Sequence, residues 1–174
     1  PCAYQRQYVE WADRGQGSGA PINVYDASSD ILTKTTRDDN NKDRLDNGNY
    51  IETCGNHYVL LVTDDGDANP ALITMKSTQM KKSRKWNSML LNLKLKGKNG
   101  LFTPPSFSHY YRLKSVKEGN DKGNWWGWEV TREEQLNDAS LYTIAKSFAE
   151  SVNKGEVKVK YEEESSTSEQ KVPF

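Results

Sequence analysis

The stretch ALITMKSTQMKKSRKWNSMLLNL (residues 71–93) determines the expected fold, because its hydrophobic pattern changes from that of a strand to that of a helix. Residues 71–75 are largely apolar and include β-branched side chains, as a central strand requires. The helical spacing i, i+3, i+4, i+7 is carried by Trp86, Met89, Leu90 and Leu93. We therefore expect a helix directly after the strand, with Ser77 or Thr78 as its N-cap and a stop near Gly97.

Strand patterns lie on both sides of this stretch. Before it, we expect strands at 4–11, 50–53 and 58–63, the last two forming a hairpin about the turn Cys54-Gly55-Asn56-His57. After the Pro104-Pro105 break, we expect a second hairpin from strands at 107–116 and 124–130. The polar residues from about 26 to 48 indicate a long surface loop.

A second helix is expected near the end of the chain. Thr131 and Glu134 have the spacing of a capping box. One apolar helical face then follows, made of Leu141, Ile144, Ala145, Phe148 and Val152. The order favours a mainly β fold, a five-stranded OB-like barrel with a helix between strands 3 and 4 and a C-terminal helix. A sandwich or another α+β domain has the same element order.

The chain's length and composition limit the protein class. With 174 residues and 24 basic against 24 acidic side chains, we expect one OB-like domain at 1–155 and a flexible acidic tail at 156–174. No apolar run is long enough for a membrane span, and the first residues do not form a signal peptide. Cys2 and Cys54 are too few for a disulfide framework. A cytoplasmic protein is expected.

Charge is strongly segregated along the chain. From Met75 to Gly100 there are eight basic residues and no acidic one. Single-strand binding needs cations that follow the phosphates and aromatic faces on which bases stack. The residues predicted to bind nucleic acid are Lys76, Lys81, Lys82, Arg84, Lys85, Trp86, Tyr110, Arg112, Lys114 and Trp125. Alternation along the second hairpin places Tyr110, Arg112, Lys114 and Trp125 opposite Phe107, Tyr111, Trp126 and Trp128, which are expected in the core.

The pattern of chemically reactive residues does not nominate a reaction. His57 and His109 stand alone in the sequence and are expected to be structural. The run containing Asp64, Asp65 and Asp67 lacks the spacing of an EF-hand loop. We therefore predict no enzyme activity, no cofactor and no metal site. A metal-dependent nuclease that uses these three carboxylates is the enzymatic alternative.

Two segments carry a resemblance to known proteins. PALITMKSTQMKKSRKWNS (70–88) and PPSFSHYYRL (104–113) resemble a family of small proteins from marine and other tailed bacteriophages, with similarity from Cys2 through Val130. The acidic tail that ends in Val172, Pro173 and Phe174 resembles the tails of bacterial and phage single-stranded DNA-binding proteins. The latter resemblance implies an OB fold and a tail that docks on replication or recombination proteins.

Together these patterns predict a phage protein that coats single-stranded DNA, or RNA, non-specifically during replication or recombination. The phosphates would be contacted by the lysines and arginines, and the bases would stack on Trp86, Tyr110 and Trp125. The alternative is a phage structural or host-takeover protein that uses the basic helix as a protein-binding surface. The prediction includes no membrane partner and allows a homodimer.

Overall fold

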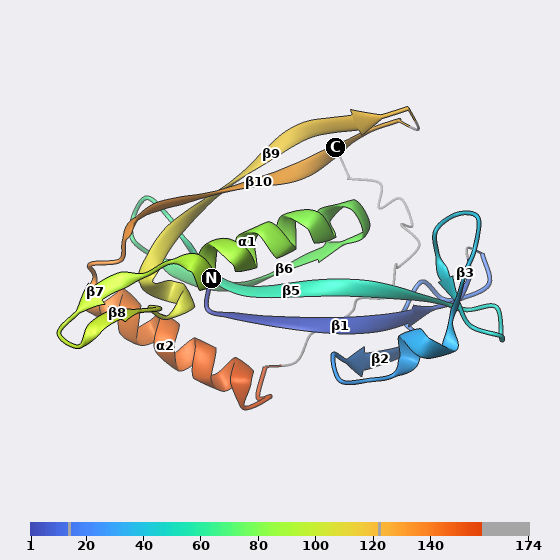
Figure 1. The fold of residues 1–174 in the computed structure, drawn as a ribbon, viewed down its shortest axis with the longest axis horizontal. Coiled ribbons are helices and arrows are strands. Elements are labelled where there is room, and N and C mark those ends of the chain that lie inside the picture. Colours follow the sequence, from blue (N-terminus) through green and yellow to red (C-terminus); the bar gives the residue numbers. More distant parts are fainter. Residues whose placement is uncertain (14, 122, 158–174) are drawn as a thin grey trace, which may run out of the picture. The chain divides into compact units, whose positions relative to one another are not determined.

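The computed structural model describes residues 1–13, 15–121 and 123–157. The chain is mainly β, with an open antiparallel sheet and two α-helices (Figure 1). Its long strands are β1 (Ala3–Trp11), β5 (Tyr50–Val62), β6 (Ala68–Lys76), β9 (His109–Asn120) and β10 (Gly123–Gln135). Its short strands are β2 (Asn23–Asp26), β3 (Thr36–Arg37), β4 (Asp43–Arg44), β7 (Leu95–Gly97) and β8 (Gly100–Phe102). The helices are α1 (Met80–Asn92), α2 (Ala139–Asn153) and the 3₁₀ segments η1 (Ile31–Lys34), η2 (Ser77–Gln79) and η3 (Ser106–Ser108).

The strands form three antiparallel sheets. The largest has the order β2-β1-β5-β4-β3, and β6 pairs with β5 outside this path. β9 pairs with β10, and β7 pairs with β8, each as a separate two-stranded sheet. The prediction of a mainly β chain with a helix between strands and a second helix near the end is confirmed by α1 and α2. The described strands do not close into the expected five-stranded barrel, because the largest sheet ends at β2 and β3.

By its internal contacts, the described chain divides into two compact units. The first unit comprises residues 1–6 and 53–157, and the second comprises residues 7–52. Two strands, β1 and β5, contribute residues to both units. Most of the predicted tail, 156–174, lies outside the described residues.

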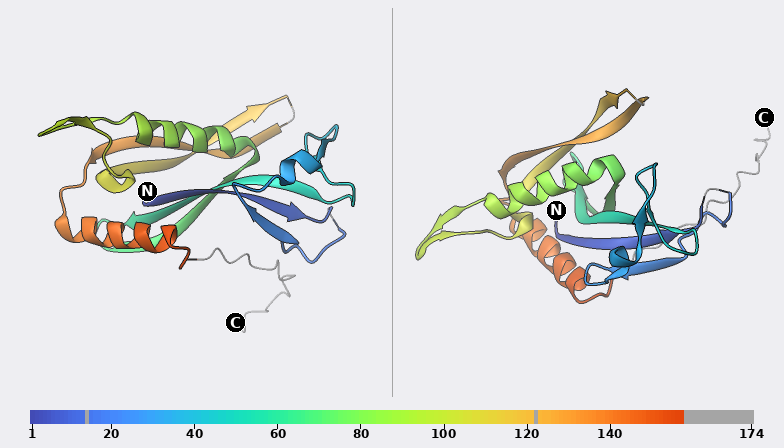
Figure 2. Two further views of the ribbon diagram at one scale, coloured as in Figure 1. Left: turned by 60° about the horizontal axis from the view of Figure 1, so that its bottom comes forward. Right: turned by 45° about the vertical axis from the view of Figure 1, so that its right-hand side comes forward.

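The core of the first unit has two parts. One is formed by Cys2, Ala145 and Ala149, with Leu60, Phe107 and Phe148 packed around them. The other is formed by Val59, Met75 and Trp86, against which the apolar side of α1 and the β9–β10 hairpin pack. In Figure 2 the β7–β8 hairpin extends away from the end of α1 in both views. The first unit thus combines a strand pair, two helices and two hairpins.

The second unit is more ordered than its polar sequence predicted. The expected long loop at about 26–48 contains η1, β3 and β4. Ile31 anchors it in a small core with Tyr8 and Ile51. Arg44 adds ion pairs, with its Nε 2.8 Å from Asp38 Oδ2 and its Nη2 3.2 Å from Asp13 Oδ1. A single buried isoleucine and a doubly paired arginine therefore order a segment of otherwise loop-like composition.

The expected hairpin turn at Cys54-Gly55-Asn56-His57 is wrong, because β5 runs through it without a break. These residues are buried rather than exposed, and each is paired with a residue of the neighbouring strand β6. Asn56 Oδ1 accepts a hydrogen bond of 2.9 Å from Thr74 Oγ1 on β6. Gly55 is required for close packing, because a Cβ there would lie 2.7 Å from Ser83 Oγ of α1.

The predicted helix boundaries also change. Thr131 to Glu134 lie in β10, paired with β9, so the expected capping box does not form. α2 begins at Ala139, and the Asp138 carboxylate accepts a hydrogen bond of 2.9 Å from Leu141 N as its N-cap. α1 begins at Met80 without a side-chain cap from Ser77 or Thr78, and it ends at Asn92 rather than near Gly97.

Candidate nucleic-acid interface

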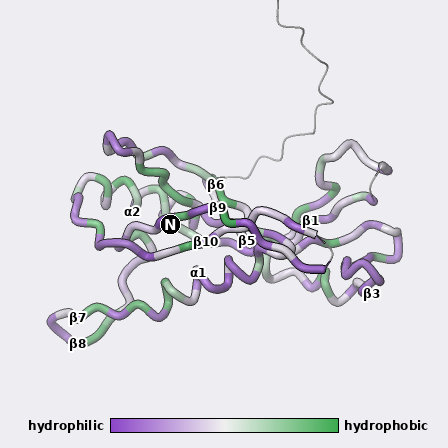
Figure 3. The backbone as a smooth tube through the Cα atoms, turned by 90° about the horizontal axis from the view of Figure 1, so that it is seen from above, coloured by the Kyte–Doolittle hydropathy of each residue, from purple (hydrophilic) through white to green (hydrophobic). Residues whose placement is uncertain are grey.

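Helix α1 separates apolar from cationic side chains. Trp86 is buried, and Met89 and Leu90 pack against the second core cluster of the first unit. Lys81, Arg84 and Lys85 are exposed, and α1 contains no acidic residue. Hydrophilic and hydrophobic segments alternate along the α1 tube in Figure 3. The helix thus exposes three positive charges to solvent while its apolar side is packed against the core.

A buried polar contact fixes the packed side of α1 against β5. His57 Nε2 on β5 lies 2.8 Å from Ser83 Oγ on α1. The His57 ring stacks on the Trp86 ring, with centroids 4.4 Å apart and an interplanar angle of 15°. Burial, together with the positive chain terminus, lowers the pKa of His57 to about 4. At neutral pH His57 is therefore uncharged and serves to seat α1, which agrees with its expected structural role.

Trp86 is removed from the predicted set of base-stacking residues. Its side chain is only 1% exposed, and its faces contact His57 and, at a centroid distance of 6.0 Å, Tyr111. The physical reason is its place in the apolar stripe of α1, which faces the core. A ring packed in this way has no face left for a base.

The β9 part of the predicted surface is largely neutralised by its partner strand. Arg112 Nε donates a hydrogen bond of 2.9 Å to Glu133 Oε1 on β10. Lys114 lies opposite Glu129 in the same ladder. Tyr110 is half-buried and lines a hollow in the first unit. Charges along β9 alone do not reveal this neutralisation, because the carboxylates come from β10 and only strand pairing brings them beside Arg112 and Lys114.

Lys82 and Trp125 meet at one carboxylate, Glu118 on β9. Lys82 Nζ forms an ion pair with Glu118 Oε1, and Trp125 Nε1 donates a hydrogen bond of 3.2 Å to Glu118 Oε2. The Lys82 hydrogen bond lowers the pKa of the Glu118 carboxyl despite some desolvation, and the Trp125 bond adds to this effect. Gly127 leaves room for this contact, because a Cβ there would lie 2.3 Å from Glu118 Oε2. We call the contact of Lys82, Trp125 and Glu118 the Glu118 clasp.

The β7–β8 hairpin was not predicted, and it continues the cationic surface. Lys94 precedes it, and Lys96 and Lys98 lie within it, all exposed. Phe102, which is 46% exposed, provides an aromatic face beside them. The sequence signal was the turn-forming stretch from Gly97 to Gly100 between Leu95 and Leu101, which is typical of a tight hairpin.

The surface that remains is defined by its lack of acidic residues. Between Asp67 and Glu118 the chain carries eleven basic residues and no acidic one. We call the exposed part on α1 and the following hairpin the cationic surface; it comprises Lys81, Arg84, Lys85, Lys94, Lys96 and Lys98. Lys76 is exposed at the end of β6, just before α1. The predicted tail residues Val172, Pro173 and Phe174 lie outside the described residues.

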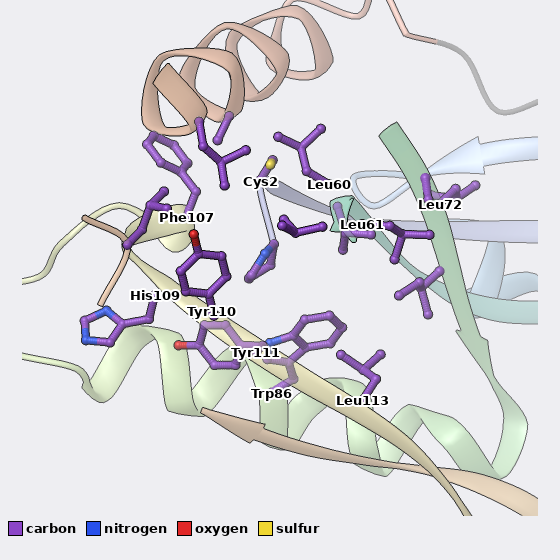
Figure 4. Close-up of a pocket in the computed structure, with 18 of the residues that line it drawn as sticks. Cys2, Leu60, Leu61, Leu72, Trp86, Phe107, His109, Tyr110, Tyr111 and Leu113 are labelled. Carbon is purple, nitrogen blue, oxygen red and sulfur yellow. The ribbon is translucent and has the colours of Figure 1, made fainter. Parts of the chain in front are cut away.

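The first unit also contains a hollow of about 500 Å³. Side chains from β5, β6, α1 and β9 surround it, including Leu60, Leu61, Leu72 and Leu113 (Figure 4). Aromatic rings of Phe107, Tyr110 and Tyr111 complete its wall. Most of the lining is apolar, and Pro1, His109, Tyr110 and Tyr111 add polar groups to it, so the hollow suits a largely apolar partner.

The alternative catalytic residues are not gathered into a metal centre. Asp64, Asp65 and Asp67 belong to the exposed turn between β5 and β6. Among residues 1–13, 15–121 and 123–157, no group of three or more His, Cys, Asp or Glu side chains is placed to hold a metal ion. Cys2 and Cys54 are both buried, and neither forms a disulfide within the described residues. In the same described ranges, no helix has the length and apolar character needed to cross a membrane.

Comparison with known proteins identifies a family. A family model described as Pam3 phage gp34-like protein matches residues 1–158, which is most of the chain. No curated protein and no solved structure matches. The expected resemblance to a bacteriophage protein family is confirmed by this match. The chain belongs to the Pam3 phage gp34-like protein family.

Proposed function

We propose that this protein binds single-stranded DNA without sequence preference during phage replication or recombination. The observation that supports the proposal best is the cationic surface, because its six basic side chains lie on consecutive elements without an intervening carboxylate. Phosphates repel acidic side chains, so a surface with many cations and few carboxylates favours contact with a strand.

Exposed aromatic rings would supply base stacking in place of Trp86. Phe102 lies beside the cationic surface. Trp126, which strand alternation placed in the core, is instead 70% exposed, because it lies near the tip of the β9–β10 hairpin. Each base that stacks on an aromatic side chain contributes about 1–3 kcal/mol. Trp126 lies opposite Lys117 in the ladder, so a ring and a cation stand side by side there as well.

The element order supports the same proposal. A strand pair, a helix, a long hairpin and a second helix follow one another as in the OB-like arrangement expected from the sequence. Residues Val172, Pro173 and Phe174 would bind replication or recombination proteins, because a terminal aromatic with a free carboxylate suits a shallow basic pocket.

Fluorescence anisotropy with a labelled oligothymidylate tests the proposal. We compare the wild type with R84A/K85A and with the control K146A/K154A, which removes two lysines from α2 and the residue after it. Loss of two phosphate contacts should reduce the salt slope of log K by about 1.4, since each contact contributes about 0.7 on a single strand. The control should leave the slope unchanged.

A salt-independent signal, or equal slopes for both variants, would contradict strand binding by this surface. An oligouridylate in the same assay decides between DNA and RNA. Equal affinity for a duplex would also argue against the proposal, because stacking on Phe102 and Trp126 requires unpaired bases.

A second candidate is a phage structural or host-takeover protein that binds another protein through the basic helix. The observation that favours it is the exposed apolar side chain of Leu91, which lies at the end of α1 beside the lysines. This candidate predicts a stoichiometric protein partner in pull-downs that Leu91→Asp abolishes, together with no affinity for oligonucleotides.

A further inference from the structure

The first unit carries two unpartnered apolar features of opposite shape. One is the hollow of about 500 Å³ beside β5, β6 and β9, which we call the pocket. The other is the β7–β8 hairpin, whose Leu101 side chain is 73% exposed. Apolar groups left in water on a hairpin of this size are typical of interaction sites.

The hairpin is thin and carries one large exposed apolar side chain on each face. Neighbouring residues of a strand point to opposite faces, so Leu101 and Phe102 lie on different sides. Leu101 is paired with Lys96, and Phe102 is paired with Leu95. The Phe102 ring lies over Gly97, where a Cβ would come within 3.2 Å of it. A flat surface could cover only one of these faces, whereas a pocket with two walls can cover both.

The pocket offers two such walls. The strand pair β5–β6 contributes Leu61 and Leu72, and the β9 side contributes Tyr110 and Leu113 (Figure 4). Leu61 is 53% exposed, so this wall is open to solvent. The volume is in the range of pockets that hold a ligand of several side-chain-sized groups, about 300–1,000 Å³.

The charges around the two features are complementary. The turn that follows Val62 of the pocket lining carries Asp64, Asp65 and Asp67, all exposed. Leu136, which also lines the pocket, is preceded at position 134 by an exposed glutamate. The hairpin and the residue before it carry Lys94, Lys96 and Lys98. The positive charges of the β7–β8 hairpin would thus meet the negative charges beside the pocket. Such complementarity steers association and fixes its register.

We propose that the β7–β8 hairpin of one copy inserts Leu101 and Phe102 into the pocket of a second copy. Because the hairpin and the pocket are different surfaces of one chain, the contact is heterologous, and repeating it gives a ring or an open row of molecules. This inference goes beyond the proposed function and does not depend on it, because the association needs no nucleic acid. If the chain also coats strands, an inserted hairpin would leave Lys81, Arg84 and Lys85 of α1 for the strand, because Phe102 and the hairpin lysines would be occupied by the second copy.

Sedimentation velocity of the full chain without nucleic acid, over a wide micromolar concentration range, tests this contact. The wild type should shift toward larger species as concentration rises. Leu101→Asp places a charge on the inserting hairpin, and Leu61→Asp places one on the pocket wall. Each variant should therefore remain monomeric. Ile144→Asp is the matched control, because it charges an equally exposed aliphatic residue of α2 outside both features. It should associate like the wild type.

Mixing the two defective variants gives the decisive result. The L101D chain keeps its pocket and the L61D chain keeps its hairpin, so an equimolar mixture should form a dimer that grows no further. Circular dichroism of each variant checks that it is folded; both substituted side chains are more than half exposed. The charge pair K96E/K98E with D64K/D65K provides a second mixture that avoids apolar substitution. It should form larger alternating species, because both contacts between the two chains are then charge-matched, whereas each variant alone should remain monomeric.

A wild type that stays monomeric throughout would overturn the inference. So would a dimer that both single variants preserve, because it would use another interface. A mixture that remains monomeric would show that the hairpin and the pocket do not meet. None of these results bears on oligonucleotide affinity, so failure here is distinguishable from failure of the proposed function.

Discussion

At the residue scale, Glu10 is a buried carboxylate of the second unit that accepts several hydrogen bonds. It is only 3% exposed and accepts hydrogen bonds from Tyr25 Oη at 2.6 Å, Asn23 Nδ2 at 2.8 Å and Asn49 Nδ2 at 2.6 Å. Burial by itself would raise the pKa of this carboxyl, but the hydrogen bonds outweigh burial and lower it to about 2. A charge buried among matched donors stabilises the unit only while it stays ionised.

Glu10→Gln should lower the free energy of unfolding by about 2 kcal/mol near pH 7, since hydrogen bonds to charged groups contribute about 1.5–3 kcal/mol. Because the folded pKa lies below the unfolded one, the stabilisation is complete above the unfolded pKa of about 4.3 and is lost as pH falls toward about 2. Urea unfolding across this range should show a shallower acid dependence for E10Q. The control Glu134→Gln should match the wild type.

His57 makes the protein acid-sensitive in a separate pH range. Its pKa is lowered to about 4 by burial, so protonation favours the unfolded chain. The stabilisation is complete above the unfolded pKa of about 6.5 and disappears as pH falls toward about 4. His57→Asn should flatten the stability profile in this range while lowering stability at neutral pH through loss of the Trp86 contact. A His57→Asn profile as steep as that of the wild type between these two values would refute the assignment.

At the element scale, α1 and the β9–β10 hairpin are joined by the Glu118 clasp. Gln79 strengthens this junction, because its Oε1 accepts a hydrogen bond of 3.1 Å from Trp128 N on β10. The clasp occupies Lys82, the one cation of α1 that is paired with a carboxylate in the described structure. A strand phosphate would therefore compete with Glu118 for this lysine.

Glu118→Gln should release Lys82 for a phosphate and tighten oligothymidylate binding. The salt slope of log K should become steeper by about 0.7, which corresponds to one more phosphate contact. Anisotropy titrations between about 50 mM and about 200 mM salt measure it. Glu150→Gln on α2 is the control and should behave like the wild type. Weaker or unchanged binding by E118Q would place Lys82 outside the strand contact.

The elements that sequence patterns predicted correctly are those whose apolar periodicity is long. The 3.6-residue stripe of α1 and α2 and the two strands of the β9–β10 hairpin belong to this group. The pattern failed at Cys54-Gly55-Asn56-His57, because turn-forming residue types there are buried by partners on β6 and α1 that only the tertiary structure supplies. It also failed at Thr131, whose apparent capping box is overridden by pairing with Arg112 in the ladder.

In the candidate site, too, some features could be predicted from the sequence and others could not. Lys81, Arg84 and Lys85 could be placed on an exposed helix face from spacing alone. The pairing of Arg112 with Glu133 and of Lys82 with Glu118 could not, because each carboxylate comes from a distant part of the chain. The β7–β8 hairpin was missed because its strands have three residues each, too few for a period to be recognised.

At the scale of the whole molecule, the two units share two continuous strands, β1 and β5. When a strand loses its partners in one unit, its extension in the other unit loses backbone order as well. Small domains with such continuous elements usually unfold in one cooperative step. We therefore expect one unfolding transition, although the internal contacts divide the chain in two.

Tryptophan fluorescence can test this coupling, because four of the five tryptophans, Trp86, Trp125, Trp126 and Trp128, lie in the first unit. Glu10→Gln acts in the second unit, yet it should shift the urea midpoint of the tryptophan signal as far as it shifts far-ultraviolet circular dichroism. The m-value should remain that of the wild type, because the same surface is exposed in the single transition. Separate midpoints for the two signals, with the tryptophan midpoint unmoved by E10Q, would mean that the shared strands do not couple the units.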